Sequence, residues 1–416
     1  MRPSRREAFR FWLKLGFISF GGPAGQIAIM HREVVERHRW LDERTFMQAL
    51  NFCMLLPGPE ALQLAIWIGW RLHGVAGAIV AGLCFIVPAV LLLLGLSFAY
   101  ALYGELPAAA SLLAGLQATV VALILHALIR IGRRALARPM HWLIALAALA
   151  TIALDLAPFP AVIMAAAAAG ALVRHESAPP VVAEPGAFPW RVLAVGLVLW
   201  LLPTLLILAT AGPRSLYAQV YGFFTTAALV TFGGAYAVLA WVNQQVVEVY
   251  GWLTQAETVV GLALAETTPG PLIIVLQFVG FMAGWHAPGG IPQATAATAT
   301  ALLASWATFL PAFILILVGA PYVERLAGQL RLGGALAGIT AAVVGVIASL
   351  ALVFGRAVFV PAGIEEPRWP AIMIAALALV LLERTRVDVL WIIACGALAG
   401  LIAGTAWGAT VLIFPG

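Results

Sequence analysis

The sequence predicts an all-α polytopic membrane protein made of two homologous halves. Of its 416 residues, 63% are hydrophobic and only 10% are charged, whereas a soluble domain carries about 25% charged residues. Long apolar runs such as 86–99 lack the period of two that a membrane barrel needs. Several motifs also occur twice at a constant spacing. These observations exclude a soluble globule and a barrel, and about 262 apolar residues allow about 13 helical spans.

Two short motifs define the repeat. Phe20–Gly22 recurs as Phe232–Gly234, and Pro57–Pro59 recurs as Pro269–Pro271, both 212 residues later. The two copies align without a gap between these anchors. Duplicated halves are common in membrane transporters, where the binding site tends to lie at the contact between the copies.

The first half is predicted to cover residues 1–175. Its apolar segments lie at 9–30, 46–70, 75–103, 108–130, 139–157 and 158–174. The basic start of the chain leads into a segment interrupted at Lys14 and at Gly21–Gly22, so we do not expect a cleaved signal peptide. A linker at 176–214 follows, with a proline-rich stretch, Ser177–Trp190, and one additional membrane helix, Val192–Ala211.

The second half is predicted to cover residues 215–416 and repeats the six segments. They lie near 217–242, 256–284, 294–320, 331–355, 368–383 and 386–414. An inserted loop after Gly280 moves later matches, such as Pro88 with Pro311, to an offset of 223. Because six segments are followed by one connecting helix, the second half is expected to be upside down relative to the first. Such inverted repeats are typical of secondary transporters.

Arginine counts orient the chain and favour re-entrant hairpins. If the N-terminus is cytoplasmic and every segment spans, 15 arginines lie inside and 7 outside. If the segments broken at Gly21–Pro23 and Pro57–Pro59 turn back within the membrane, the loop His31–Arg44 returns to the cytoplasm and the counts become 19 and 3. Arginine concentrates on the cytoplasmic side, which favours the hairpins, and Arg130 is interpreted as one of these topology signals.

The four breaks at matched positions are the predicted substrate site. Glycine lets a ligand approach the backbone closely, and proline prevents a continuous helix. The helix that restarts beyond a break presents unpaired N–H groups and the positive end of its dipole, which attract an anion. A kink or a packing contact is the alternative at any single break, and matching breaks in both halves favour a site.

Polar side chains cluster at the breaks, where their hydroxyl and amide groups are expected to donate to an oxyanion. The candidate substrate-binding residues are Ser19, Gly21, Gly22, Pro23, Gln26, Pro57, Gly58, Pro59 and Gln63 in the first half, and Thr231, Gly233, Gly234, Thr267, Thr268, Pro269, Gly270 and Pro271 in the second.

Charged residues near the breaks are candidates for charge and proton coupling, because ionisable groups in a bilayer are costly. They are Lys14, Glu60, Arg71, Arg133, Glu266 and Arg356. Glu60 and Glu266 flank the two Pro-Gly-Pro turns from opposite sides, and either could carry a proton. A structural pair with an arginine is the alternative for each. Lys14, the only lysine, could instead extend to the membrane surface.

Other chemistries find little support. Cys53, Cys84 and Cys395 are widely spaced in apolar segments and are expected to be buried free thiols. His73 and His126 have no partner at metal-ligand spacing, and nucleotide-binding motifs are missing, so neither a metal nor a cofactor is predicted. The net charge of +5 comes from loop arginines, so nucleic-acid binding is not expected.

Taken together, the motifs resemble the chromate transporter family. The resemblance is carried by Phe20–Pro23, Trp40–Leu41, Leu56–Ala61, Phe232–Tyr236 and Glu266–Leu272, and it covers essentially the whole chain, as in the long, two-domain form. It implies an inner-membrane antiporter, not an enzyme, that exports chromate from bacteria, confers chromate resistance and is driven by the proton gradient. Sulfate is the similar natural anion.

Electrostatics agrees with export, because moving a dianion out of a negative cytoplasm releases about 4.6 kcal/mol per 100 mV. Three alternatives stay open: an importer of sulfate or another oxyanion, an anion channel, and a membrane-embedded chromate reductase, which the lack of a cofactor motif disfavours. Chromate, sulfate and protons are the expected ligands, the lipid bilayer surrounds the protein, and a homodimer is left open.

Overall fold

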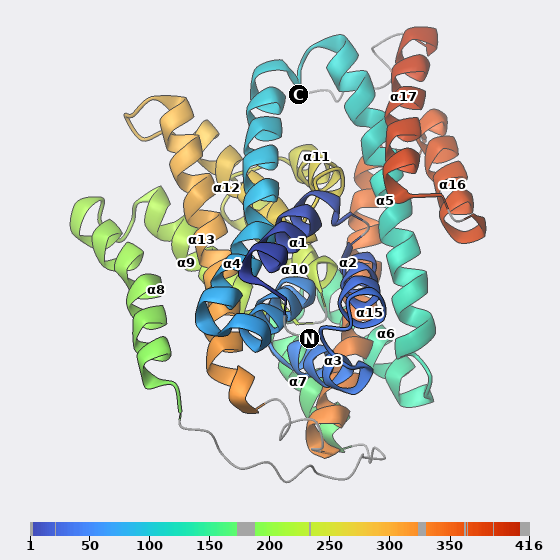
Figure 1. Ribbon diagram of the computed structural model, residues 1–416. Helices are drawn as coiled ribbons and strands as arrows, with labels where there is room; N and C mark the ends of the chain where they lie inside the picture. Colours follow the sequence, from blue (N-terminus) through green and yellow to red (C-terminus); the bar gives the residue numbers. More distant parts are fainter. Residues whose placement is uncertain are drawn as a thin grey trace.

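The computed structural model describes residues 3–20, 22–172, 188–232, 234–322, 330–361, 363, 365–385 and 387–407. All regular elements in these ranges are helices (Figure 1). The helices long and apolar enough to cross a membrane are Glu60–Tyr103, Pro107–Ala135, Trp190–Thr210, Gln293–Tyr322 and Gly333–Phe359. The all-helical, polytopic part of the prediction is therefore confirmed.

The helices follow the predicted segments closely. The first half contains α1 (Arg5–Ile18), α2 (Gly22–His31), the π-helix η1 (Arg32–Arg37), α3 (Glu43–Leu55), α4 (Glu60–Tyr103), α5 (Pro107–Ala135), α6 (Pro139–Ala153) and α7 (Phe159–Leu172). The additional helix is α8 (Trp190–Thr210). The second half contains α9 (Leu216–Val230), α10 (Ala235–Gln244), the π-helix η2 (Gln245–Val249), α11 (Gln255–Glu266), η3 (Leu272–Ile274), α12 (Val275–His286), α13 (Gln293–Gly319), η4 (Ala320–Tyr322), α15 (Leu330–Phe359), α16 (Trp369–Arg384) and α17 (Val389–Trp407).

Side-chain caps explain where the broken helices begin. Asp42 accepts the Thr45 N–H at the start of α3, and Thr254, 212 residues later, caps α11 in a reciprocal capping box with Glu257. Such caps satisfy N–H groups that have no partner within the helix. The same local chemistry therefore sets the same helix start in both halves.

Helix α4 is two helices folded back on each other. Its backbone leaves helical geometry at His73 (φ −137°, ψ 23°) and Gly74 (φ 65°, ψ −156°). On either side of this turn, Gly69 and Gly77 approach so closely that a Cβ on either one would overlap the carbonyl oxygen of the other. The parts 60–72 and 75–103 are therefore antiparallel, as the separate segments 46–70 and 75–103 predicted.

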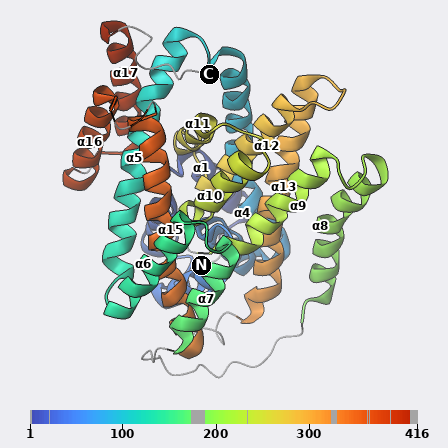
Figure 2. The ribbon, with the colours of Figure 1, turned by 180° about the vertical axis from the view of Figure 1, so that it is seen from behind.

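The long helices of the two halves interlock (Figure 2). Helix α5 of the first half packs against α16 and α17, whereas α15 of the second half packs against α6 and α7. Glycines permit these contacts: Gly115 of α5 lies against Gly396 and Gly400, and Gly338 of α15 lies against Gly170. Small residues let membrane helices approach closely and gain van der Waals contact.

Helix α8 lies at one edge of the molecule, opposite α16 and α17 (Figures 1 and 2). Pro203 lacks an N–H and so leaves the carbonyl of Leu199 without its helical partner. The Trp306 indole N–H donates to that carbonyl at 3.1 Å, and the Tyr221 hydroxyl donates to the carbonyl of Trp200 at 2.6 Å. These bonds attach α8 to α13 and α9.

Two predictions about isolated side chains are wrong. Cys53 and Cys84 are buried as expected, but Cys395 is exposed on α17, because that helix has only one side against the protein. His126 is not isolated, because its Nδ1 lies 2.7 Å from Glu383 Oε1 on α16. The contact joins residues 257 positions apart, so no local spacing could indicate it.

Candidate functional site

The breaks of each half are hydrogen-bonded to breaks of the other half. The Gly58 N–H, between α3 and α4, donates to the carbonyl of Thr231 at 2.7 Å, between α9 and α10. In the same way, the Gly270 N–H donates to the carbonyl of Ser19 at 2.9 Å. Gly58 and Gly270 are 212 positions apart, as are Ser19 and Thr231. Backbone that is not helical must find such partners at membrane depth.

Glycines at the breaks have backbone angles that other residues rarely adopt. The φ angles are 70° at Gly22, 100° at Gly234, 126° at Gly58 and 118° at Gly270. A Cβ on Gly58 would lie 2.8 Å from the Gln63 Nε2. Gly270 is equally confined, since its Cβ would lie 2.7 Å from the Ala89 Cβ. The backbone angle therefore favours glycine at all four positions, and at Gly270 the lack of space requires it as well.

Three of the five prolines at the breaks lie in the first turn or at the N-cap of a helix. Pro23 lies in the first turn of α2, Pro59 is the N-cap of α4 and Pro271 is the N-cap of η3. The other two, Pro57 and Pro269, each lie one residue before the paired glycine. The predicted site residues Gly21 and Gly233 lie outside the described residues.

Two buried glutamines complete the contacts at the breaks. The Gln26 Nε2 donates to the carbonyls of Ser19 at 3.1 Å and Gly270 at 2.5 Å, so this side chain joins the two halves. The Gln63 Nε2 donates to the carbonyl of Pro57 at 2.8 Å. The Oε1 atoms of both glutamines are buried and accept no hydrogen bond from the described residues. A buried amide oxygen without a hydrogen bond lowers the stability of the fold by about 1–3 kcal/mol. Such a group therefore needs an explanation, and a functional role is one.

The hydroxyl groups at the breaks donate within their own helices. Ser19 donates to the carbonyl of Leu15 and Thr231 to that of Ala227, again 212 positions apart. Thr267 and Thr268 both donate to the carbonyl of Leu264. The sequence analysis predicts that these hydroxyls donate to an oxyanion. Each hydroxyl must first release the bond within its own helix.

Glu266 is the one carboxylate of the Pro-Gly-Pro turns with a hydrogen-bond donor. It is buried at the end of α11, and the Tyr236 hydroxyl on α10 donates to its Oε1. Arg130 on α5 is close enough to act electrostatically on both. Glu60, in contrast, lies partly exposed in the first turn of α4, where the helix dipole favours its negative charge.

The candidate cations lie away from the breaks. Lys14 is exposed on α1, and Arg133 is exposed and lies 3.3 Å from Glu383. Arg356 lies in the last turn of α15, and Arg71 lines a cavity at the far end of the 60–72 helix. In the described ranges, none of the four forms a hydrogen bond or ion pair with a residue of the breaks.

Sequence reasoning did not single out Tyr236, and it considered Arg130 only as a topology signal. Tyr236 directly follows the Phe232–Ala235 motif, and Arg130 lies one helical turn deeper in its apolar segment than Arg133. A charge at that depth is the signal that could have identified Arg130. The described residues contain no group of three or more His, Cys, Asp or Glu side chains that could hold a metal ion.

Comparison with known proteins agrees with this architecture. The family model named "Chromate transporter" matches residues 6–171 and 218–401. The chromate transport protein of Pseudomonas aeruginosa is 32% identical over 95% of this chain and 91% of its own length. The chromate transport protein of Cupriavidus metallidurans is 28% identical, over 96% and 93%.

A third relative is from an archaeon. A protein of Methanocaldococcus jannaschii, named an uncharacterized transporter, is 25% identical over 78% of each chain. No solved structure matches the chain. Because the family model covers both halves and two relatives are matched almost end to end, this protein is a multi-pass membrane transporter rather than an enzyme, and it belongs to the chromate transporter family.

Proposed function

We propose that this protein is a secondary carrier that exports chromate, a tetrahedral oxyanion, from the cytoplasm and so confers chromate resistance. The observation that carries the proposal is the cross-pairing of the breaks, Gly58 with Thr231 and Gly270 with Ser19. A site whose walls come from both halves changes shape when one half moves against the other. Alternating access requires such a change.

The proposed carrier has a repeat at 1–175, a linker with one helix at 176–214 and an inverted repeat at 215–416. The separate family matches at 6–171 and 218–401 support this division. Support for a shared fold comes from corresponding π-helices, η1 and η2, and from matched hydrogen bonds at an offset of 212. We place the chain in the bacterial inner membrane with its N-terminus in the cytoplasm, because this puts most arginines inside.

The proposed substrate site consists of the four breaks and the side chains at them. Backbone N–H groups at helix starts recognise charge and shape rather than the central atom of an anion. Sulfate has the same shape and charge as chromate, so it is expected to compete. Gln26 bridges the two halves and is positioned to sense their relative movement.

Proton coupling is proposed to run through Glu266. Its burial and its bond to Tyr236 favour a group that changes protonation only when the surroundings change. Inward movement of protons would then accompany outward movement of the dianion. Glu60 is the second carboxylate considered for this role.

Flux measurements in proteoliposomes test the proposal. Radiolabelled chromate flux should saturate, fall in the presence of sulfate, and respond separately to an imposed pH gradient and an imposed potential. Gly270→Ala should abolish it, whereas Gly95→Ala, at an open helical position, should leave it unchanged. Flux that does not saturate would indicate a channel, and flux only of sulfate toward the cytoplasm would indicate an importer.

A further inference from the structure

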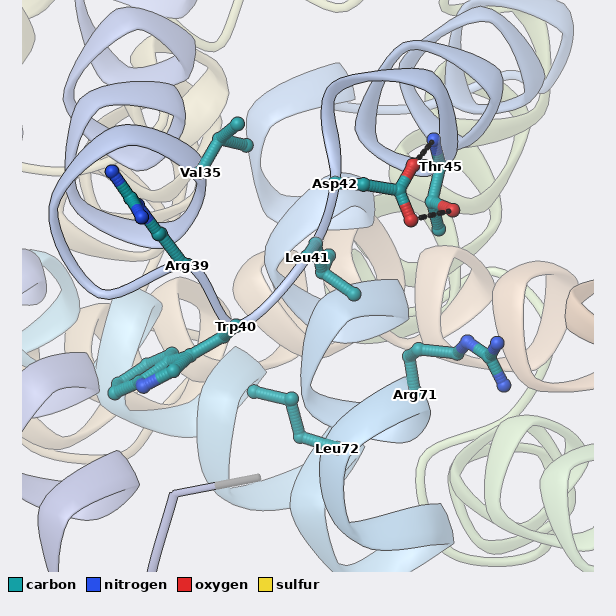
Figure 3. A pocket seen from close by; sticks show the side chains of 8 residues that line it. All are labelled: Val35, Arg39, Trp40, Leu41, Asp42, Thr45, Arg71 and Leu72. Carbon is teal, nitrogen blue, oxygen red and sulfur yellow. Dashed lines mark hydrogen bonds between the residues drawn. The ribbon is translucent and has the colours of Figure 1, made fainter. Parts of the chain in front are cut away.

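A cavity of about 550 Å³ lies where η1 and the 60–72 helix end and α3 begins (Figure 3). Its lining residues are Val35, Arg39, Trp40, Leu41, Asp42, Thr45, Arg71 and Leu72. They come from η1, from the loop between η1 and α3, from the start of α3 and from the end of the 60–72 helix. The helix α2, which continues into η1, begins at one break of the first half, and α3 ends and the 60–72 helix begins at the other, so each leads from the cavity to the proposed site.

Most charges around this cavity are already paired. Glu33 lies 3.3 Å from Arg37 and 3.7 Å from Arg32, and His31 lies 3.2 Å from Glu36 and 2.7 Å from Glu43. The Glu33 pairs cancel part of the charge of the loop that follows α2. In the cavity lining, two arginines and one aspartate give a net charge of +1.

Asp42, the one carboxylate in the lining, keeps its negative charge, but its oxygens are held by hydrogen bonds within the chain. Its two oxygens accept hydrogen bonds from the Thr45 N–H at 2.8 Å and the Thr45 hydroxyl at 3.0 Å. Figure 3 shows the Asp42 carboxylate turned toward Thr45. In contrast, Arg39 and Arg71 form no ion pair or hydrogen bond with any described residue. Figure 3 places them on opposite sides of the loop that carries Trp40 and Leu41.

Arg39 also adopts a strained backbone angle. Its φ is 51°, in the left-handed region that favours glycine, and the corresponding residue of the second half is Gly251, with a φ of 60°. Arg71 corresponds in the same way to Ala283. Neither cation is therefore required by the fold, and strain kept at an exposed, unpaired arginine indicates a function.

We infer that this cavity, with Arg39 and Arg71, is a docking site where a divalent tetrahedral oxyanion collects before it moves to the breaks. The inference rests on the proposed function and on a cytoplasmic N-terminus. Both guanidinium groups are exposed, so they attract the anion by charge through water rather than by a tight, desolvated contact. The second half has no such cations at the corresponding positions, so docking favours the cytoplasmic side.

The test replaces each arginine of the cavity with the residue at the corresponding position of the second half. Chromate uptake is measured in inside-out vesicles, where the cytoplasmic face is accessible, for Arg39→Gly and Arg71→Ala. Arg44→Ala is the matched control, because Arg44 lies nearby in the first turn of α3 but does not line the cavity, and Ala256 is its counterpart. Each cavity variant should raise the half-saturating chromate concentration about threefold to tenfold with an unchanged maximal rate. The difference should shrink at high salt, and Arg39→Lys should retain wild-type behaviour.

Two outcomes would overturn the inference alone, and a third would show failure of the proposed function. Wild-type protein without chromate flux would refute the carrier itself. Wild-type flux with cavity variants equal to Arg44→Ala would refute only the docking site. An effect that appears in vesicles with anionic lipid and vanishes in purely zwitterionic vesicles would assign the arginines to lipid headgroups instead. Thermal unfolding of Arg39→Gly should be no lower than wild type, since the substitution removes strain.

Discussion

At the scale of single residues, the structure distinguishes groups that hold the fold from groups that are free to act. Asp42 and Thr254 are caps that start two corresponding helices, and their oxygens are occupied. Glu266 is different, because it is buried, accepts a hydrogen bond from Tyr236 and is under the electrostatic influence of Arg130. A carboxylate in this setting is a candidate for proton transfer rather than for structural support alone.

Glu266→Gln should remove the response of chromate flux to a pH gradient. The amide keeps the shape of the side chain and can still accept from Tyr236, but it cannot take up a proton. Flux driven by an imposed potential should remain. The control is Glu257→Gln, which changes the carboxylate at the other end of α11 and should leave the pH response intact. A wild-type pH response in Glu266→Gln would exclude this residue as the coupling group.

Asp42→Ala should destabilise the protein by about 1 kcal/mol, because the start of α3 loses its cap. Asp42→Thr should be nearly neutral, since Thr254 performs the same role in the second half. The thermal midpoints of the three proteins in detergent give the comparison. An unchanged thermal midpoint in Asp42→Ala would show that the cap does not contribute.

The Asp42 cap should also depend on pH. Hydrogen bonds from the backbone N–H and the hydroxyl of Thr45 lower the pKa of Asp42 below its ordinary value of 3.8. Since the folded pKa is the lower one, the contribution of the carboxylate is full above the ordinary value and is lost as pH falls through the folded value. The stability difference between wild type and Asp42→Ala should therefore be constant near neutral pH and narrow only in strong acid.

At the scale of elements, the breaks are positioned by backbone geometry as much as by side chains. Each half contributes one Gly-Gly break and one Pro-Gly-Pro break. Each Pro-Gly-Pro break donates a backbone N–H to a carbonyl at the Gly-Gly break of the opposite half. Interlocking of α5 with α16 and α17, and of α15 with α6 and α7, holds the halves around them. The breaks are thus non-helical segments supported by long, well-packed helices.

Gly58→Ala should abolish transport and lower stability by about 1–3 kcal/mol. Alanine at a φ of 126° is strained, and its Cβ would displace Gln63. Gly95→Ala is the control, because Gly95 is helical with open space around it, and alanine there should be neutral or add about 0.5–1 kcal/mol. Flux and the thermal midpoint should be measured on both variants. Normal flux in Gly58→Ala would mean that this break is only a kink.

At the scale of the whole molecule, transport depends on how the two halves are placed across the membrane. Matching bonds and backbone angles at an offset of 212 indicate one design used twice. If the copies are inverted, corresponding residues lie on opposite sides of the bilayer. The same operation would place the arginine-lined cavity on one side and its uncharged counterpart on the other.

Labelling of corresponding cysteines should reveal the inversion. Glu36 and Glu248 are exposed and lie 212 positions apart, at the ends of η1 and η2. In a background with Cys395→Ala, a membrane-impermeant thiol reagent should label Glu36→Cys only from the cytoplasmic side and Glu248→Cys only from outside. Labelling of both from one side would contradict inverted repeats, and labelling of Glu36→Cys from outside would restore full spans in place of hairpins.

The sequence by itself determined the class of the protein, the helices and the four breaks. Hydrophobic length, glycine, proline and capping residues act within a few positions, so Phe20–Gly22 and Pro57–Pro59 indicate breaks wherever the chain goes. Only the tertiary structure decided which break pairs with which, how Arg130 comes to act on Glu266, and that Arg39 and Arg71 share a cavity. These contacts join residues far apart in the chain, and their free energy comes from packing and partner choice, which leave no local periodicity in the sequence.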